Sequence, residues 1–76
     1  MSEDRCILGV NRRWYPGPSG HTEIVVVLVA GAIGDYAAYA GTGPDEYIRD
    51  YGDKVSFEEA CVHFPGGQLE RAKYRD

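Results

Sequence analysis

The hydrophobic pattern of the chain is dominated by Ile24–Val29, a run in which every residue is apolar. A strand with one face in water alternates apolar and polar residues, whereas a strand buried on both faces does not. The run is too short to span a membrane, and it predicts a central strand over residues 21–30. Because a chain of 76 residues can cover about one face of a sheet with its own helices, we expect a partner to cover the other face.

Turn residues and glycines divide much of the remaining chain into further strands. Residues 5–15 are predicted to form a first strand, which the Pro-Gly-Pro-Ser-Gly segment connects to the second strand in a hairpin. Residues 35–40 contain alanines, which favour a helix, and tyrosines, which favour a strand. We interpret them as a strand, because six residues between glycines make a poor helix. Residues 68–75 alternate in polarity and predict a short edge strand protected by charge.

Two short helices are predicted between the third strand and the last. The first follows Pro44, carries acidic residues in its first turn and ends at Gly52. The second begins at Ser56, which forms a capping box with Glu59. Each helix has apolar residues at the spacing of one helical face. These are Pro44, at the start of the first helix, with Tyr47, Ile48 and Tyr51, and Phe57, Ala60, Cys61 and Phe64 in the second helix.

The order of these elements, β-β-β-α-α-β, predicts an α+β fold with a small antiparallel sheet and two short helices on one face. At this length the whole chain, residues 1–76, is expected to form a single domain. An apolar fraction of 43% is typical of a folded domain. A formal net charge of −4 argues against a general duplex-DNA binder, so nucleic acid is not an expected partner.

The first residues, Met-Ser-Glu-Asp-Arg, lack the apolar segment of a signal peptide. We therefore expect a cytoplasmic protein that does not associate with a membrane. Its two cysteines, Cys6 and Cys61, are expected to be free thiols in that compartment, with a disulfide between them as the alternative.

The best candidate for binding is the segment Arg12, Arg13, Trp14 and Tyr15. Arginine guanidinium groups bind phosphates and carboxylates, while tryptophan and tyrosine offer flat surfaces for stacking. The same residue types are enriched at the centres of protein interfaces. Three interpretations are open for this segment: Trp14 fills one end of the core while the arginines face solvent, the segment contacts a protein, or it contacts a nucleotide or nucleic acid.

Two tyrosines of the third strand, Tyr36 and Tyr39, are further binding candidates. They point to opposite faces of the strand, and the small alanines beside them leave shallow space next to each ring. That space suits either a helix of the same chain or a side chain of a partner.

Catalytic and metal chemistry find little support. Cys61 and His63 are two residues apart on a predicted helix and point to different sides, so they do not form a nucleophile–base pair. A zinc site would need Cys6 and His21 as well, without any paired Cys-x-x-Cys spacing. We therefore expect no enzymatic activity, no metal and no cofactor.

Two stretches resemble a pattern found in short proteins of undetermined function encoded by phages and prophages. They are Ile33-Gly-Asp-Tyr-Ala-Ala-Tyr-Ala-Gly41 and Gly52-Asp-Lys-Val-Ser-Phe-Glu-Glu-Ala-Cys-Val-His-Phe-Pro-Gly66. The similar proteins often have tryptophan at the position of Tyr36. The resemblance covers about the central half of the chain and implies no catalytic residues. It implies an accessory role, including inhibition of a host system by direct contact.

These observations lead to two functional hypotheses. The first is a non-enzymatic interaction module, a homodimer or a protein that contacts a host protein, which uses a bare sheet face or a sheet edge. The alternative is a protein that binds a nucleotide, a nucleic acid or a small ligand through Arg12, Arg13, Trp14 and Tyr36.

Overall fold

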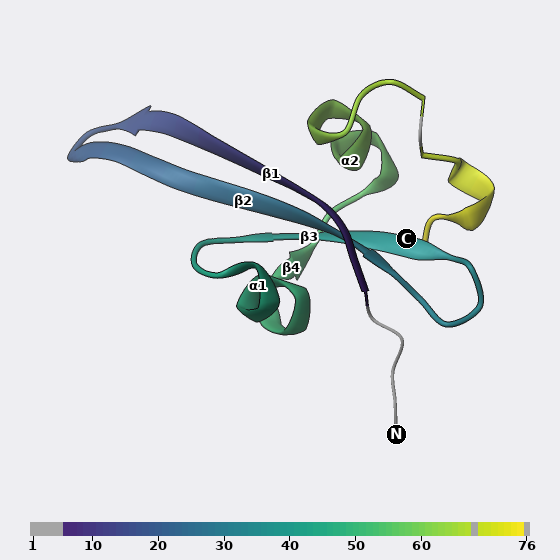
Figure 1. Cartoon of the computed structure of the whole chain (residues 1–76). Helices are drawn as coiled ribbons and strands as arrows, with labels where there is room; N and C mark the ends of the chain where they lie inside the picture. Colours follow the sequence, from purple (N-terminus) through teal and green to yellow (C-terminus); the bar gives the residue numbers. More distant parts are fainter. Residues whose placement is uncertain (1–5, 68, 76) are drawn as a thin grey trace.

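The computed structural model describes residues 6–67 and 69–75. Its strands are β1 (Cys6–Gly17), β2 (Gly20–Ala30), β3 (Tyr36–Gly41) and β4 (Asp53–Lys54), and its helices are α1 (Asp45–Tyr51), α2 (Phe57–His63) and the 3-10 helix η1 (Arg71–Lys73). The strands form one antiparallel sheet in the order β1-β2-β3-β4 (Figure 1). The predicted fold class, a small α+β fold with an antiparallel sheet and two short helices, is confirmed. Arg5 and Gln68, at the margins of two predicted strands, lie outside the described residues.

The central strand β2 is buried on both faces, as its sequence predicts, but the chain covers both faces itself. Val25, Val27 and Val29 pack with Ile48 of α1 on one face. On the other face, Val26 and Leu28 belong to a cluster that includes Ala60 of α2. The two helices therefore lie on opposite faces of the sheet (Figure 1), which corrects the prediction that they share one face.

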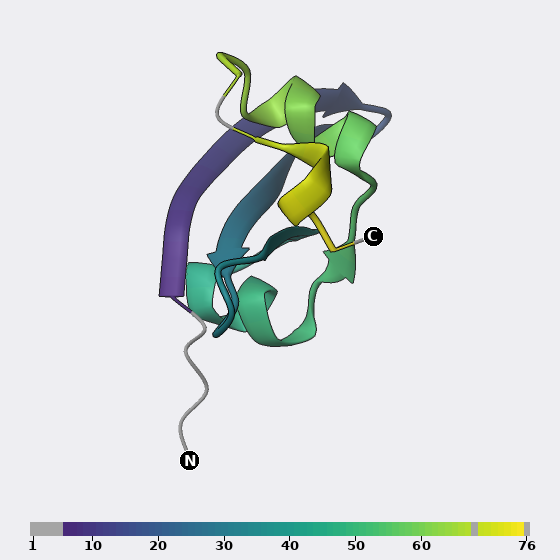
Figure 2. The same cartoon turned by 90° about the vertical axis from the view of Figure 1, so that its right-hand side faces the viewer.

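The physical reason for this arrangement is the short strand β4. After α1 the chain pairs with the outer edge of β3, where Asp53 lies opposite Ala40 and Lys54 opposite Tyr39. It thereby passes around the edge of the sheet and begins α2 on the other face (Figure 2). Within residues 6–67 and 69–75, neither face of β2 is left bare, which corrects the expectation that a partner covers one of them.

Local sequence explains where the helices begin and end. The Ser56 side chain accepts a hydrogen bond from the Glu59 backbone N–H at 3.2 Å, as the capping box predicts. Gly52 ends α1 where the chain passes close to the sheet. A Cβ at that position would lie 2.6 Å from the Ile48 carbonyl oxygen and 2.9 Å from that of Ala40. Only glycine fits there.

The predicted last strand, residues 68–75, is replaced by η1 and an isolated parallel bridge between Tyr74 and Tyr36. The buried Tyr74 hydroxyl donates to the Val55 carbonyl oxygen at 2.6 Å and accepts from the Ala38 backbone N–H at 3.1 Å. The Arg75 N–H donates to the Tyr36 carbonyl oxygen at 2.8 Å. A single side chain and a few backbone bonds thus close the edge of β3 that β4 does not reach.

The first hairpin is longer than the strand that flanks it. β3 pairs with β2 only from Val25 to Ala30, so residues 13–24 extend past the end of β3 as a two-stranded ribbon (Figure 1). We call these residues the hairpin arm. A β-bulge at Leu8 shifts the register of β1 near its other end.

Candidate interaction surface on the first hairpin

Among residues 6–67 and 69–75, no strand pairs with the outer edge of β1. Figure 2 shows β1 at one side of the molecule, and among the described residues β1 pairs only with β2. Pro16 lies opposite His21 and has no N–H, so its nitrogen faces away from β2. Because the hydrogen-bonding direction alternates along an antiparallel strand, the backbone groups of Trp14, Arg12 and Val10 also face outward.

Trp14 and Tyr15 lie on the hairpin arm and are exposed, at 64% and 41% of their surface. The interpretation of Trp14 as a plug of the core is therefore wrong. The two rings point to opposite faces of the ribbon, because neighbouring residues of a strand alternate in direction. Trp14 shares its side with Arg12 and α1, and Tyr15 shares its side with Asn11 and α2.

Both arginines of the candidate segment have partners within the chain. Arg12 contacts the Asp45 carboxylate and lies 3.5 Å from that of Glu23. Arg13 donates from Nε to the Asn11 side-chain oxygen at 3.0 Å. Two carboxylates beside Arg12 weaken its attraction for a phosphate, so the surroundings of this segment favour a protein contact over an anionic ligand.

The structure does not bring Tyr36 and Tyr39 to this surface. Both are half-buried on β3, and β3 ends where the hairpin arm begins. Tyr36 packs edge-on against Tyr74 at 6.0 Å between ring centroids, and its hydroxyl bonds to the backbone of Glu70. Tyr39 packs with the valines of β2 on the α1 face. Of the two alternatives for these rings, the structure shows packing within the chain.

His63 is a buried polar residue that the sequence reasoning did not single out as part of the core-facing side of α2. It is only 8% exposed, and its Nδ1 lies 3.4 Å from the Asn11 side-chain oxygen. The sequence holds a signal for this burial: His63 lies three residues after Ala60, and this spacing places both residues on the side of α2 that faces the sheet. Cys61, expected on that face, is only half-buried.

This buried histidine links α2 to β1 through Asn11, which also accepts from Arg13. Within residues 6–67 and 69–75, no three histidine, cysteine or acidic side chains form a group that could hold a metal ion. The cysteines in that range, Cys6 and Cys61, are both free.

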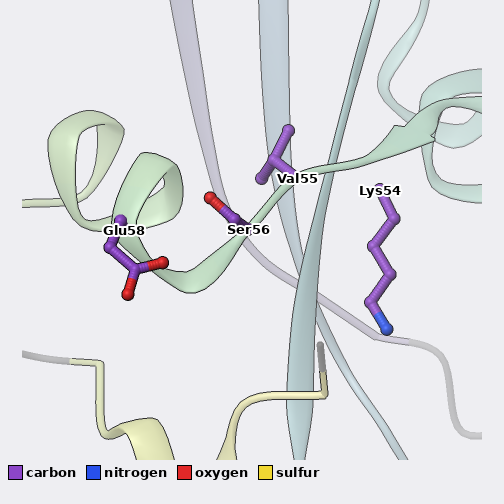
Figure 3. Close-up of a pocket in the computed structure, with 4 residues that line it drawn as sticks. All are labelled: Lys54, Val55, Ser56 and Glu58. Carbon is purple, nitrogen blue, oxygen red and sulfur yellow. The ribbon is translucent and has the colours of Figure 1, made fainter.

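A shallow cavity of about 420 Å³ lies where β4 leads into α2, lined by Lys54, Val55, Ser56 and Glu58 (Figure 3). The Ser56 hydroxyl is already used in the helix cap. On α1, a hydrogen bond to the Asp50 carboxylate raises the pKa of Arg49. Figure 3 shows the Lys54 and Glu58 side chains on either side of Val55 and Ser56.

No family model, curated protein or solved structure matches the chain. No helix among the described residues is long and apolar enough to cross a bilayer. The fold and surface define the class to which the protein belongs: a small α+β protein with a closed edge at β3 and an open edge, rich in arginine and aromatic residues, at β1.

Proposed function

We propose that the protein is a non-enzymatic interaction module that binds another protein chain through the outer edge of β1 and the hairpin arm. The observation that carries this proposal is the exposure of Trp14 and Tyr15 on a ribbon that extends beyond the sheet. Large aromatic side chains contribute most when a partner covers them, and tryptophan, tyrosine and arginine dominate interface energetics. Exposed edge strands also accept an added strand readily.

The resemblance to phage and prophage proteins adds a setting for this activity. An accessory protein that acts by direct contact needs a binding surface and no catalytic centre. The open edge and the arm supply such a surface, since their backbone groups and rings are free to meet another chain. A bacterial host protein and a second copy of the chain are the two partners that this function allows.

The test is a comparative capture experiment from bacterial lysate that also contains an untagged copy of the chain. The tagged variants are the wild type, the double variant Trp14→Ala/Tyr15→Ala and the control Tyr47→Ala/Tyr51→Ala. The control removes two exposed rings that pack on each other at 5.1 Å on α1. We expect the wild type and the control to capture the same protein, which is either a host protein or the untagged copy. The arm variant should not capture it. Equal capture by all three variants would refute the proposal.

A further inference from the structure

The open part of β1 has two natural limits. At one end the bulge at Leu8 interrupts the regular alternation of the strand. At the other end Pro16 presents no N–H to an incoming strand. Between them lies the segment Gly9–Tyr15, which is regular in its pairing with β2 and has Arg12 at its centre.

We propose that two copies of the chain pair antiparallel along Gly9–Tyr15, with Arg12 at the two-fold axis. This inference rests on the proposed function and names the partner of the same surface. In this register every residue of the segment faces a residue of the second copy. At each end, the ladder stops where Leu8 of one copy lies opposite Pro16 of the other. A register shifted by two residues either shortens the ladder or places Leu8 or Pro16 inside it. The outward backbone groups of Val10, Arg12 and Trp14 then form the hydrogen bonds of one continuous sheet.

Side chains on the α1 side of the segment complement one another in this register. Val10, an exposed apolar residue of β1, faces Trp14 of the second copy. Pairs of an aromatic and a β-branched residue across strands are favourable. The two Arg12 side chains meet at the axis, but each is already balanced by Asp45 and Glu23 of its own chain. These carboxylates reduce the repulsion between the two guanidinium groups.

The α2 side is complementary as well. Gly9 faces Tyr15 of the second copy, so that the Tyr15 ring meets the Phe64 ring packed over Gly9. The Phe64 ring already covers Gly9, with a ring atom 3.3 Å from where a Cβ would lie. Asn11 faces Arg13 of the second copy. Within its own chain, the Asn11 side chain already accepts a hydrogen bond from Arg13. Each hairpin arm thus lies against the body of the other copy.

The first experiment removes one outward N–H without altering any side chain. The chain is short enough for chemical synthesis, and the variant carries an N-methyl group on the Trp14 backbone nitrogen. The matched control carries the same group on Glu23, which lies opposite Trp14 on β2, beyond the end of β3. We expect the wild type and the control to show the same concentration-dependent dimer in sedimentation equilibrium.

The N-methyl-Trp14 chain should dissociate at least about tenfold more readily, because the two-fold axis removes two hydrogen bonds at once. Circular dichroism checks that each synthetic chain folds. A dimer that N-methyl-Trp14 leaves intact would show that another surface is used and would overturn the proposal.

The second experiment tests the register with cysteines in a Cys6→Ser/Cys61→Ala background. In an antiparallel pair of hydrogen-bonded residues the Cα atoms lie about 5.5 Å apart, close enough for a short bifunctional thiol reagent to bridge two cysteines. Such a reagent should therefore crosslink Arg12→Cys to itself, and it should not crosslink the exposed control Thr22→Cys. Linking of both variants, or of neither, would overturn the proposed register.

These outcomes separate the inference from the proposed function. A wild-type chain that is a monomer at every concentration overturns the pairing of two copies. If that monomer still captures a protein in a manner that depends on Trp14 and Tyr15, the interaction function stands and the partner is a different protein. If it captures nothing through the arm, both proposals fail.

Discussion

The Tyr74 hydroxyl replaces a strand at the edge of β3, and its removal offers a stringent test of how this edge is held. In Tyr74→Phe the ring remains, but the Val55 carbonyl and the Ala38 N–H lose the partners they have at 2.6 and 3.1 Å. Leaving a buried polar group unsatisfied costs about 1–3 kcal/mol. With two groups affected, we expect the free energy of unfolding to fall by about 2–6 kcal/mol.

That loss is large for a chain of this size, whose total stability is on the order of 4–11 kcal/mol. It corresponds to a fall in Tm of about 10 °C or more. Urea titration and thermal melting, both followed by far-UV circular dichroism, measure it. The matched control is Tyr36→Phe, whose hydroxyl bonds to the exposed backbone of Glu70, and we expect a loss of less than about 1 kcal/mol there. If Tyr74→Phe is no less stable than the control, the Tyr74 hydroxyl does not hold this edge.

Three further predictions concern the end of α1, the start of α2 and the hairpin arm. Gly52→Ala should reduce the free energy of unfolding by more than about 2 kcal/mol, because its Cβ would clash with the Ile48 carbonyl oxygen; an unchanged urea midpoint would contradict this. Ser56→Ala should cost about 1 kcal/mol through loss of the helix cap, and a thermal melt that overlays the wild type would argue against the cap. A panel of nucleotides should leave the emission of Trp14 unchanged, since Arg12 is balanced by carboxylates; a saturable change at micromolar concentration would favour the ligand hypothesis instead.

Much of the fold follows from local sequence signals. The apolar run of β2, the Pro-Gly-Pro-Ser-Gly turn and the capping box at Ser56 each depend on neighbouring residues, and the structure has all three features. The strand interpretation of residues 35–40 agrees with β3 for the same reason, since its flanking glycines limit its length. Short-range chemistry therefore suffices for element type and for the hairpin.

The arrangement of the elements depended on contacts that local patterns do not encode. β4 has only two residues, too few to leave a periodic signal, yet it takes α2 to the opposite face from α1. The spacing of Tyr47 and Tyr51 predicts burial, but both are exposed and pack on each other, because a single residue of α1, Ile48, fills the contact with the sheet.

The candidate surface was predictable in its residues but not in its setting. Residue types alone single out Arg12–Tyr15, and the structure places all four on one strand with an open edge. The partners of the arginines, Asp45 and Asn11, are not apparent from the sequence, because one lies on α1 and the other depends on the register of β1. Tyr36 and Tyr39 were predicted as further binding residues on opposite faces of their strand, and only Tyr36 was grouped with the arginines, but tertiary packing places both rings within the body of the protein.

The two short helices have a consequence for how the protein folds. Each has seven residues, whereas isolated helices of fewer than about 12–15 residues are marginal in water. Neither helix can therefore persist before the sheet forms. The sheet, in turn, needs both helices to shield the two faces of β2 from water. Sheet and helices must form in one cooperative step, with no stable half-folded species between the unfolded chain and the native one. The hairpin arm, which lies beyond β3, can open and close on its own while the rest stays folded.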